Sequence, residues 1–370
     1  MKERETLWEA CLKKGMNRRT FLKSCVALTS LMGLSTDMVS KVVEAAETKP
    51  LPVVLWLSGH ECTGCSESFI RSGAPLPSDV LLTNIALEYS HLLSAGSGDD
   101  LEAHLEKMMK QHRGKYILAV EGAVATGDNG IYCMSGGKPF MKTLREAAAG
   151  AAAVIAYGSC AAYGGIQAAK PNPTGSAGIG KYISAKAVIN VPGCPPIPEV
   201  MTGVVMHLAM FGVLPPLDSD NRPKQFFGNR VHDTCYRRPF FDAGMFADRY
   251  DDAGAKAGWC LYRLGCRGPE TYSSCGNMRW HQGLSYPIQS GSACIGCASP
   301  KFWDEAPFSD RMPKYGPLGD IDMIGAGMAA ASVAGVAAHG ALSLLQKQKR
   351  DKEEAAEARH GMNHGEGGDK

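Results

Sequence analysis

The chain has 370 residues, of which 45% are hydrophobic and 8% aromatic, and its formal net charge at pH 7 is +2. These values are typical of a globular protein of about two domains. The nearly balanced charge supplies no basic stripe, which argues against nucleic acid as a partner. Thirteen cysteines and 43 glycines are the features that point beyond an ordinary globular core.

Residues 1–46 have the features of a targeting segment that is removed from the mature protein. Arg18 and Arg19 form a twin-arginine pair, and the apolar run Cys25–Leu34 follows it. Ala45–Ala46 offers small residues for cleavage, and the alternative is an ordinary amphipathic N-terminal helix. Twin-arginine signals export folded proteins, which suits a cofactor that is inserted before export. This route also argues against disulfides, the usual expectation for an exported chain.

Between residues 50 and 217, short apolar runs alternate with helical patterns, which predicts a parallel α/β sheet. The predicted strands are Pro52–Leu57, Val80–Leu87, Tyr116–Val120, Ala153–Tyr157 and Ala187–Val191. Apolar residues at helical spacing predict one amphipathic helix around residues 101–109. A second helix follows the last strand, and Pro198 lies near its first turn, where proline is well tolerated.

Four cysteines of this region follow three of its predicted strands. Cys62 and Cys65 form a CxxC pair after the first strand, whereas Cys160 and Cys194 follow the fourth and the fifth. The carboxyl ends of parallel strands meet at the edge where α/β sheets bind ligands, so we expect these thiols to converge. Four thiolates suit a [4Fe–4S] cluster. A structural zinc ion also accepts four cysteines but usually takes two CxxC pairs, and only one is present.

Residues 218–318 lack strong periodic patterns and are rich in glycine, proline, arginine and aromatic residues. Such a long stretch normally argues against an ordered domain, but bound metal can supply free energy of folding. Two further groups of potential ligands lie here. They are His232, Cys235, Cys260 and Cys266, and then Cys275, Cys294 and Cys297. We therefore predict a poorly regular cluster-binding domain after the sheet domain.

These two groups predict different cofactors. The residues of the His232 group are equally suitable for a Cys₃His zinc site and for a [4Fe–4S] cluster. Its imidazole leaves one negative charge fewer than a fourth thiolate would, and it suits a surface position near an external electron partner. The Cys275 group has three thiolates, and the nearby stretch Tyr286–Gln289 offers Pro287 instead of a fourth ligand. Three thiolates favour a [3Fe–4S] cluster.

Three cluster sites in one chain would indicate that the protein moves electrons over distance. Of the other cysteines, Cys11 and Cys25 lie in the targeting segment, and Cys133 is expected to be a lone core thiol. Glu61 and Glu121 lie at the same edge of the sheet as the first group. They are candidates for a proton path, although an ordinary solvated or hydrogen-bonded carboxylate is the favoured interpretation.

Residues 323–345 form an uncharged run that is long enough to cross a bilayer. Aspartates precede the run and basic residues follow it, so the positive-inside rule places the tail 346–370 in the cytoplasm and the main body outside. The alternative is a buried alanine-rich helix. His339 within the run is a candidate haem ligand, although a polar contact to another helix is favoured. From Asp351 onward the charged tail is predicted to be disordered.

Several short motifs accompany the cysteine groups. They are Glu61–Ser68, Asp128–Cys133, Gly158–Cys160, Pro192–Pro196, Gly265–Thr271 and Cys294–Cys297. Together they resemble the small subunit of membrane-bound periplasmic [NiFe]-hydrogenases of the uptake type, and the resemblance covers essentially the whole chain. It implies a flavodoxin-like parallel sheet domain at residues 50–217, a poorly regular iron–sulfur domain at 218–318 and a C-terminal transmembrane helix.

The resemblance also implies a function for each group. The Cys62 group would hold the proximal [4Fe–4S] cluster, the Cys275 group the medial [3Fe–4S] cluster and the His232 group the distal [4Fe–4S] cluster. The family's nickel–iron site belongs to a separate large subunit, where H₂ is oxidised to protons and electrons, so no residue of this chain would be catalytic. Electrons would leave for a membrane cytochrome b or another quinone-reducing subunit at the periplasmic face.

Two alternatives to a hydrogenase small subunit, and the oxygen-tolerant subtype of that family, can be distinguished by sequence. A non-enzymatic multi-cluster electron carrier would lack the nickel-bearing partner, and the related proximal-cluster subunit of respiratory complex I lacks the second and third groups. Oxygen-tolerant members of the resembling family carry two extra cysteines around the proximal cluster. Gly64 and Gly165 occupy those places here, which predicts a four-cysteine proximal cluster and sensitivity to oxygen.

Overall fold

The computed structural model describes residues 5–73, 76, 84–183, 188–305 and 321–362. The chain divides into one compact unit that extends to Arg311 and a second unit that contains the long C-terminal helix. All thirteen cysteines lie within the described residues, and none of them forms a disulfide.

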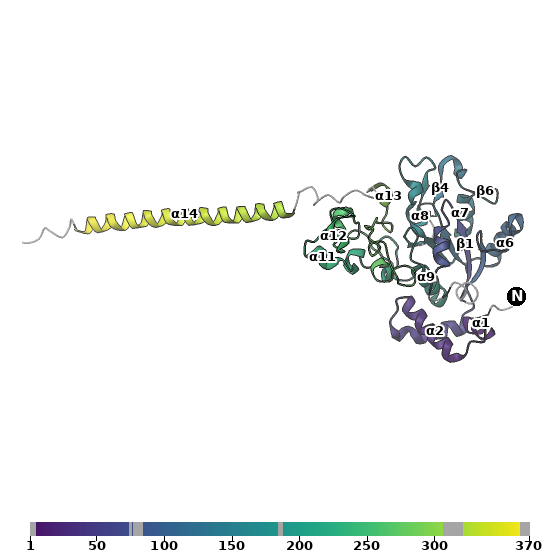
Figure 1. Ribbon diagram of the computed structural model, residues 1–370. Helices are drawn as coiled ribbons and strands as arrows, with labels where there is room; N and C mark the ends of the chain where they lie inside the picture. Colours follow the sequence, from purple (N-terminus) through teal and green to yellow (C-terminus); the bar gives the residue numbers. More distant parts are fainter. Residues whose placement is uncertain (1–4, 74–75, 77–83, 184–187, 306–320, 363–370) are drawn as a thin grey trace, which may run out of the picture. The chain divides into compact units, whose positions relative to one another are not determined.

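The centre of the first unit is a parallel sheet of five strands with the order β2-β1-β3-β7-β9 (Figure 1). Its strands are Ala86–Ser90 (β2), Val53–Ser58 (β1), Ile117–Glu121 (β3), Ala153–Tyr157 (β7) and Val188–Val191 (β9). Numbered along the chain, this order is 2-1-3-4-5, the flavodoxin-like arrangement. The predicted parallel α/β sheet is confirmed, and four of its predicted strands agree to within one residue; Ala187 lies outside the described residues.

The second predicted strand, Val80–Leu87, is wrong in position. Its first four residues lie outside the described residues, and β2 begins at Ala86 and continues to Ser90. β2 is at the edge of the sheet, where Tyr89 is buried while Glu88 is partly exposed. Edge strands tolerate polar side chains, so a search for continuous apolar runs places this strand too early.

Helices cover both faces of the sheet, which explains why its strands are apolar on both sides. They are α4 (Gly64–Phe69), α6 (Gly98–Gln111), α7 (Phe140–Gly150), α8 (Gly158–Tyr163) and α9 (Pro198–Phe211). Val54 and Trp56 of β1 belong to the core that includes α9, whereas Leu55 and Leu57 belong to the core that includes α6 and α7. Both predicted helices are confirmed as α6 and α9, and Pro198 begins α9.

Short elements complete the sheet domain. They are the antiparallel pairs β4 (Val124–Ala125) with β8 (Ser176–Ala177) and β5 (Met134–Ser135) with β6 (Lys138–Pro139), and the 3-10 turns η3 (Gly127–Gly130), η4 (Ile166–Ala168) and η5 (Ile179–Lys181). The η4 turn follows Cys160 closely, so it contributes to the edge of the sheet where the first cysteine group lies.

The N-terminal segment forms helices that contact the sheet domain. They are α1 (Leu7–Lys13), α2 (Arg18–Leu31), the 3-10 turn η1 (Thr36–Met38) and α3 (Val39–Thr48). Asn17 caps α2 by accepting a hydrogen bond from the backbone N–H of Thr20. Both α2 and α3 contact α9, as the position of the purple helices in Figure 1 illustrates. Removal of residues 1–46 by cleavage stays a prediction.

Residues 218–305 contain only short helical elements within their described part, as the weak periodicity predicted. They are α10 (Lys224–Phe227), η6 (Val231–Thr234), α11 (Arg238–Asp242), α12 (Ala253–Lys256), η7 (Tyr262–Leu264), η8 (Ser274–Gly276) and α13 (Phe302–Glu305). A small core lies among them, built around Val231, Leu261, Tyr286 and Ile288, and Cys266 is part of it. Potential metal ligands are therefore also core residues in this region.

The second unit contains α14, a helix of 42 residues from Ile321 to Met362. Among the described residues, it is the one helix long and apolar enough to cross a membrane; within residues 327–356, its most apolar 18-residue stretch has a mean hydropathy of 1.6. That α14 crosses a membrane stays a prediction, as does the alternative of a buried alanine-rich helix.

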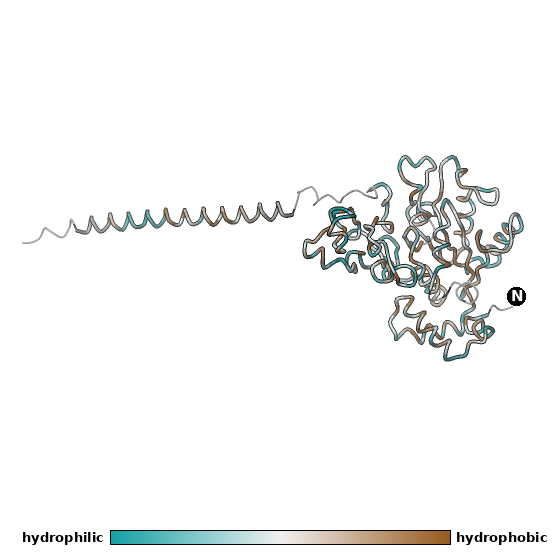
Figure 2. Tube along the Cα trace, in the orientation of Figure 1, coloured by the Kyte–Doolittle hydropathy of each residue, from teal (hydrophilic) through white to brown (hydrophobic). Residues whose placement is uncertain are grey.

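The prediction that the tail is disordered from Asp351 is wrong as far as Met362, because α14 continues through it. The charged stretch, visible as the hydrophilic part of α14 in Figure 2, consists largely of strong helix formers such as Ala, Glu, Lys and Gln. Lys349 and Glu353 also form an ion pair of 3.9 Å at helical spacing. Residues 363–370 lie outside the described part.

Candidate iron–sulfur sites

The first cysteine group converges at the carboxyl edge of the sheet, as predicted. Cys62 and Cys65 lie at the start of α4 after β1, Cys160 lies on α8 after β7, and Cys194 follows β9. Burial raises the pKa of the Cys65 thiol well above its usual value, and the neighbouring charges of Glu121, Cys160, Cys62 and Cys194 raise it further. The four thiols are therefore close enough to influence one another electrostatically.

Two glycines let the backbone approach these sulfurs closely. A Cβ atom added to Gly158 would lie 2.4 Å from Sγ of Cys65, and one added to Gly165 would lie 2.4 Å from Sγ of Cys160. Both glycines have positive φ angles, of +83° and +66°, which side-chain-bearing residues rarely adopt. The loops therefore leave no room for side chains where the sulfurs lie, and they fit a compact sulfur-rich cofactor.

A carboxylate pair lies behind this group. Glu121, at the end of β3, is fully buried and accepts hydrogen bonds from the backbone N–H of Ser66 at 2.7 Å and from the Ser58 hydroxyl at 3.1 Å. Burial and the neighbouring charge of Glu121 raise the pKa of Glu61 to about 7. One carboxylate oxygen of Glu61 is buried without a hydrogen-bond partner in the structure. Glu121 is thus a hydrogen-bonded carboxylate, as favoured, whereas Glu61 is partly exposed and leaves one oxygen without a partner.

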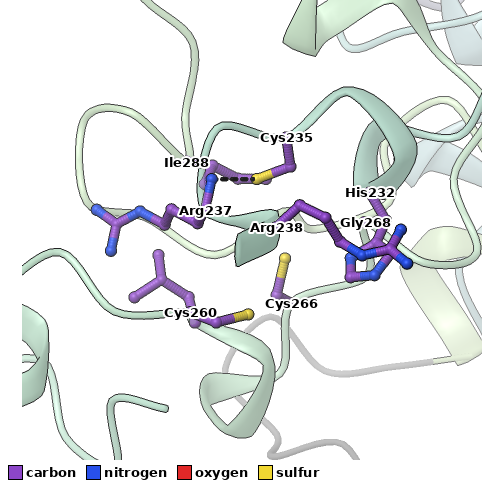
Figure 3. Close-up of a pocket in the computed structure, with 9 residues that line it drawn as sticks. His232, Cys235, Arg237, Arg238, Cys260, Cys266, Gly268 and Ile288 are labelled. Atoms are coloured by element: carbon purple, nitrogen blue, oxygen red, sulfur yellow. Dashed lines mark hydrogen bonds between the residues drawn. The ribbon is translucent and has the colours of Figure 1, made fainter. Parts of the chain in front are cut away.

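The four residues of the second group line one pocket, shown in Figure 3. The sulfurs of Cys235, Cys260 and Cys266 point into it, and the His232 ring lies at its edge. The backbone N–H of Arg237 donates to Sγ of Cys235 at 3.4 Å. Within the described residues, no three His, Cys, Asp or Glu side chains are arranged to hold a single metal ion.

Hydrogen-bond donors also surround the third group, whose ligands lie on η8 and on the stretch that ends at Cys297. The Ser273 hydroxyl lies 3.2 Å from Sγ of Cys275. Cys275 and Cys297 line one pocket together with Trp280. Burial, followed by the charges of Cys266, Cys297 and Cys275, raises the pKa of Cys294 well above its usual value.

The third group lies between the other two. Burial and the charges of Cys275 and Cys194 raise the pKa of Cys297 to about 12, so Cys297 is close to a member of the first group. Cys294 is in turn close to Cys266 of the second group, and the backbone N–H of Arg267 donates to the Cys294 carbonyl at 2.7 Å. Position along the chain did not reveal this order, because the His232 group stands between the other two in sequence; the resemblance to the family implied it.

Sequence reasoning missed two polar residues that contact these sites. The Ser159 hydroxyl donates to the backbone carbonyl of Cys297 and accepts from the backbone N–H of Gly193 at 3.0 Å. The Tyr286 hydroxyl donates to Sγ of Cys235 at 3.6 Å. The position of Ser159 directly before the ligand Cys160 could have indicated its role. No sequence feature indicated the role of Tyr286, because its partner Cys235 is 51 residues away.

Comparisons with known families agree with this geometry. The family of the C-terminal region of NiFe/NiFeSe hydrogenase small subunits matches residues 227–309, and the family "NADH ubiquinone oxidoreductase, 20 Kd subunit" matches residues 62–208. The second match covers the sheet domain alone. The chain therefore combines a sheet domain shared with the respiratory subunit and a C-terminal region that is described for hydrogenases.

Curated relatives and solved structures extend the comparison to the whole chain. The uptake hydrogenase small subunit of Azotobacter vinelandii is 48% identical over 350 residues, which cover 94% of this chain and 98% of the relative. The hydrogenase-1 small chain of Escherichia coli K12 is 44% identical over 363 residues, with coverages of 97% and 98%. The Ni-Fe-Se hydrogenase of Desulfomicrobium baculatum gives a TM-score of 0.67 at 34% identity and covers 71% of this chain and 100% of its own. This chain belongs to the family of [NiFe]-hydrogenase small subunits.

Proposed function

We propose that the three groups of this hydrogenase small subunit hold a proximal [4Fe–4S], a medial [3Fe–4S] and a distal [4Fe–4S] cluster that conduct electrons in series. The family is the electron-transfer partner of a large subunit that carries the catalytic site. The observation that supports the series most directly is the pair of close approaches between groups. Cys194 is near Cys297, and Cys294 is near Cys266.

The donor set fits the proposed cofactors. When bound, iron–sulfur clusters accept and release single electrons at potentials set by ligand charge, hydrogen bonds and burial. Burial raises the pKa of Cys160 and of Cys260 to about 11, so these sites favour neutral thiols unless a cation compensates the thiolate charge. Bound iron would provide that compensation. The backbone and side-chain donors around Cys235 and Cys275 would then stabilise the more negative, reduced state of each site.

The exposure of the ligands suggests where electrons enter and leave. Cys62 and Cys194 of the proximal group are exposed in this chain, at the edge of the sheet where a large subunit is expected to dock. We assign the exit to the distal group, because the single imidazole of His232 lowers the negative charge of that site. The acceptor proposed there is a membrane cytochrome b or another quinone-reducing subunit.

The two ends of the chain support a location at the periplasmic face of the membrane. The twin-arginine pair at Arg18 and Arg19 would direct export, and α14 would anchor the exported protein. Basic residues after the apolar part of α14 favour a cytoplasmic tail.

The proximal site is proposed to be of the four-cysteine type. Gly64 and Gly165 stand where oxygen-tolerant members would have additional cysteines. A Cβ atom at Gly165 would collide with Sγ of Cys160, so a side chain there would require the loop to change its conformation. This arrangement supports an oxygen-sensitive enzyme.

The proposed function is tested on the native membrane complex by metal analysis combined with hydrogen-dependent reduction of a dye. We expect about 11 iron atoms per small subunit, from clusters of four, three and four irons, together with nickel in the partner subunit. Iron without nickel or hydrogen-dependent activity would identify a non-enzymatic electron carrier. Zinc without visible charge-transfer absorption would overturn the cluster assignment.

A further inference from the structure

Helix α9 is buried on all sides, although only one of its sides faces the sheet. Twelve of its fourteen residues are buried. On the sheet side, the Tyr157 hydroxyl donates to the Met201 carbonyl at 2.9 Å. On the other side, α2 and α3 of the N-terminal segment cover the helix and share its hydrophobic core. The residues of a predicted targeting segment thus complete the core of the domain that they would be removed from.

The contact between this segment and the domain is closely fitted. A Cβ atom added to Gly203 of α9 would lie 2.9 Å from the backbone carbonyl oxygen of Leu31, at the end of α2. A Cβ atom added to Gly33 would lie 3.0 Å from Cβ of Gln225 on α10. Directly after the segment, Lys49 donates from Nζ to the Met210 carbonyl at 2.8 Å, which satisfies a carbonyl in the last turn of α9.

The side chains buried in this contact are those that a targeting segment must present elsewhere. Phe21, Cys25 and Met32 are at most 1% exposed. Arg18, the first of the twin arginines, forms a 2.8 Å ion pair with Glu47 and lies over the Trp8 ring at 5.7 Å. The apolar run cannot pack on α9 and contact an export receptor or a lipid phase at the same time.

We propose that α9 and α10 form a docking surface for the chain's own N-terminal segment, and that this docking withholds the apolar run from the export machinery until the segment is released. The proposal rests on the targeting function proposed above for residues 1–46. It adds an autoinhibitory contact whose partner is a segment of the same chain, held by apolar burial and by the close approaches at Gly203 and Gly33.

Cys25 of α2 is a natural reporter of the packed segment, because its thiol is fully buried and belongs to the core that the segment shares with α9. The full-length chain, loaded with iron and bound to its partner subunit, is labelled anaerobically with a maleimide, and each cysteine peptide is quantified by mass spectrometry. We expect Cys25 to react far more slowly than in the urea-unfolded chain. Equal rates in the two states would overturn the docking.

Gly203→Ala is the variant designed to loosen the contact, since the new methyl group meets the Phe226 ring at 2.8 Å and the backbone carbonyl of Leu31 at 2.9 Å. We expect Cys25 to be labelled about tenfold faster, as a loss of about 1.4 kcal/mol in docking would produce. Met32→Asp, which changes the segment alone, should act in the same direction. Gly180→Ala is the matched control, because its Cβ atom would meet nothing closer than 4.0 Å. Unchanged labelling in both test variants would contradict the assigned surface.

The inhibitory part is tested by binding of the full-length chain to membrane vesicles that contain the twin-arginine export machinery. We expect the Gly203→Ala chain to bind more than the wild-type and Gly180→Ala chains. Equal binding of all three would overturn autoinhibition. Hydrogen-dependent dye reduction by the same preparations is a separate readout. Its absence in the wild type would contradict the proposed function. The Cys25 labelling rates would still decide whether the segment docks.

Discussion

The sheet domain and the region at residues 218–305 are stabilised in different ways. In the sheet, residues such as Leu55, Val120 and Ile155 are fully buried and pack against helices on both faces. In the second region, a small core includes the potential ligand Cys266 itself. The proximal group therefore lies on a fold that apolar packing already specifies. The ligands of the distal group, in contrast, help to form the core of their own region. The difference predicts that iron matters unequally to the two regions.

The largest expected effect follows removal of iron by a chelator under reducing conditions. We expect residues 218–305 to lose most of their protection from hydrogen exchange, because metal binding supplies much of their folding free energy. The strands of the sheet should keep their protection. The measurement is hydrogen exchange with mass spectrometry on holo and iron-free protein. Equal loss of protection in both regions would contradict this difference between them.

A smaller effect is expected at the connection between the two regions. Ser159→Ala removes the hydroxyl that joins Gly193 to Cys297, and leaves a buried N–H and a carbonyl without this partner. We expect a destabilisation of about 1–3 kcal/mol, measured as a lower midpoint for thermal loss of the visible iron–sulfur absorbance. Ser290→Ala, at an exposed serine, is the control and should leave the midpoint unchanged.

Tyr286 should influence the distal site without a large effect on stability. Tyr286→Phe removes a donor to Cys235, which should lower the reduction potential of the distal site by about 40 mV, if the hydrogen bond contributes about 1 kcal/mol. A redox titration followed by electron paramagnetic resonance measures this shift. Tyr236→Phe is the matched control, since the Tyr236 hydroxyl donates to the Ile288 carbonyl and not to a sulfur. An equal shift in both variants would contradict the assignment.

The smallest effect is expected within the sheet domain, at His91. Burial lowers the pKa of His91 below its ordinary value of 6.5, although Glu102 nearby opposes the shift. The ring also contacts Tyr89 and Ser135. Protonation therefore favours the unfolded chain, so stability is full above pH 6.5 and decreases as the pH falls toward the folded-state pKa. His91→Gln should reduce this acid dependence of the melting temperature. If the melting temperature of the variant depended on pH just as that of the wild type does, the assignment of this acid dependence to His91 would be contradicted.

The sheet was predictable from sequence because its strands are short apolar runs that follow one another regularly. β2 was misplaced because an edge strand carries Glu88 and other polar residues. The membership of each cysteine group followed from spacing and from the resemblance to the family. The order of the groups followed from the resemblance but not from spacing, because Cys266 and Cys294 are neighbours in space while 28 positions separate them in sequence.

At the two ends of the chain, composition left the conformation of the segments open. An apolar run such as that of α2 has the same composition whether it meets a membrane or the surface of α9, so sequence alone does not identify its partner. The charged part of α14 was predicted to be disordered from its polarity, yet its alanine, glutamate and lysine residues favour a helix. In both cases composition indicated the class of segment and not its conformation.

The central claim, three clusters in series with a three-iron cluster in the middle, is tested most directly by electron paramagnetic resonance with spin quantification on the native complex. The account predicts one [3Fe–4S] signal per small subunit after oxidation and two interacting [4Fe–4S] signals after reduction by hydrogen. The absence of a three-iron signal, or a proximal signal typical of a six-cysteine cluster, would contradict it.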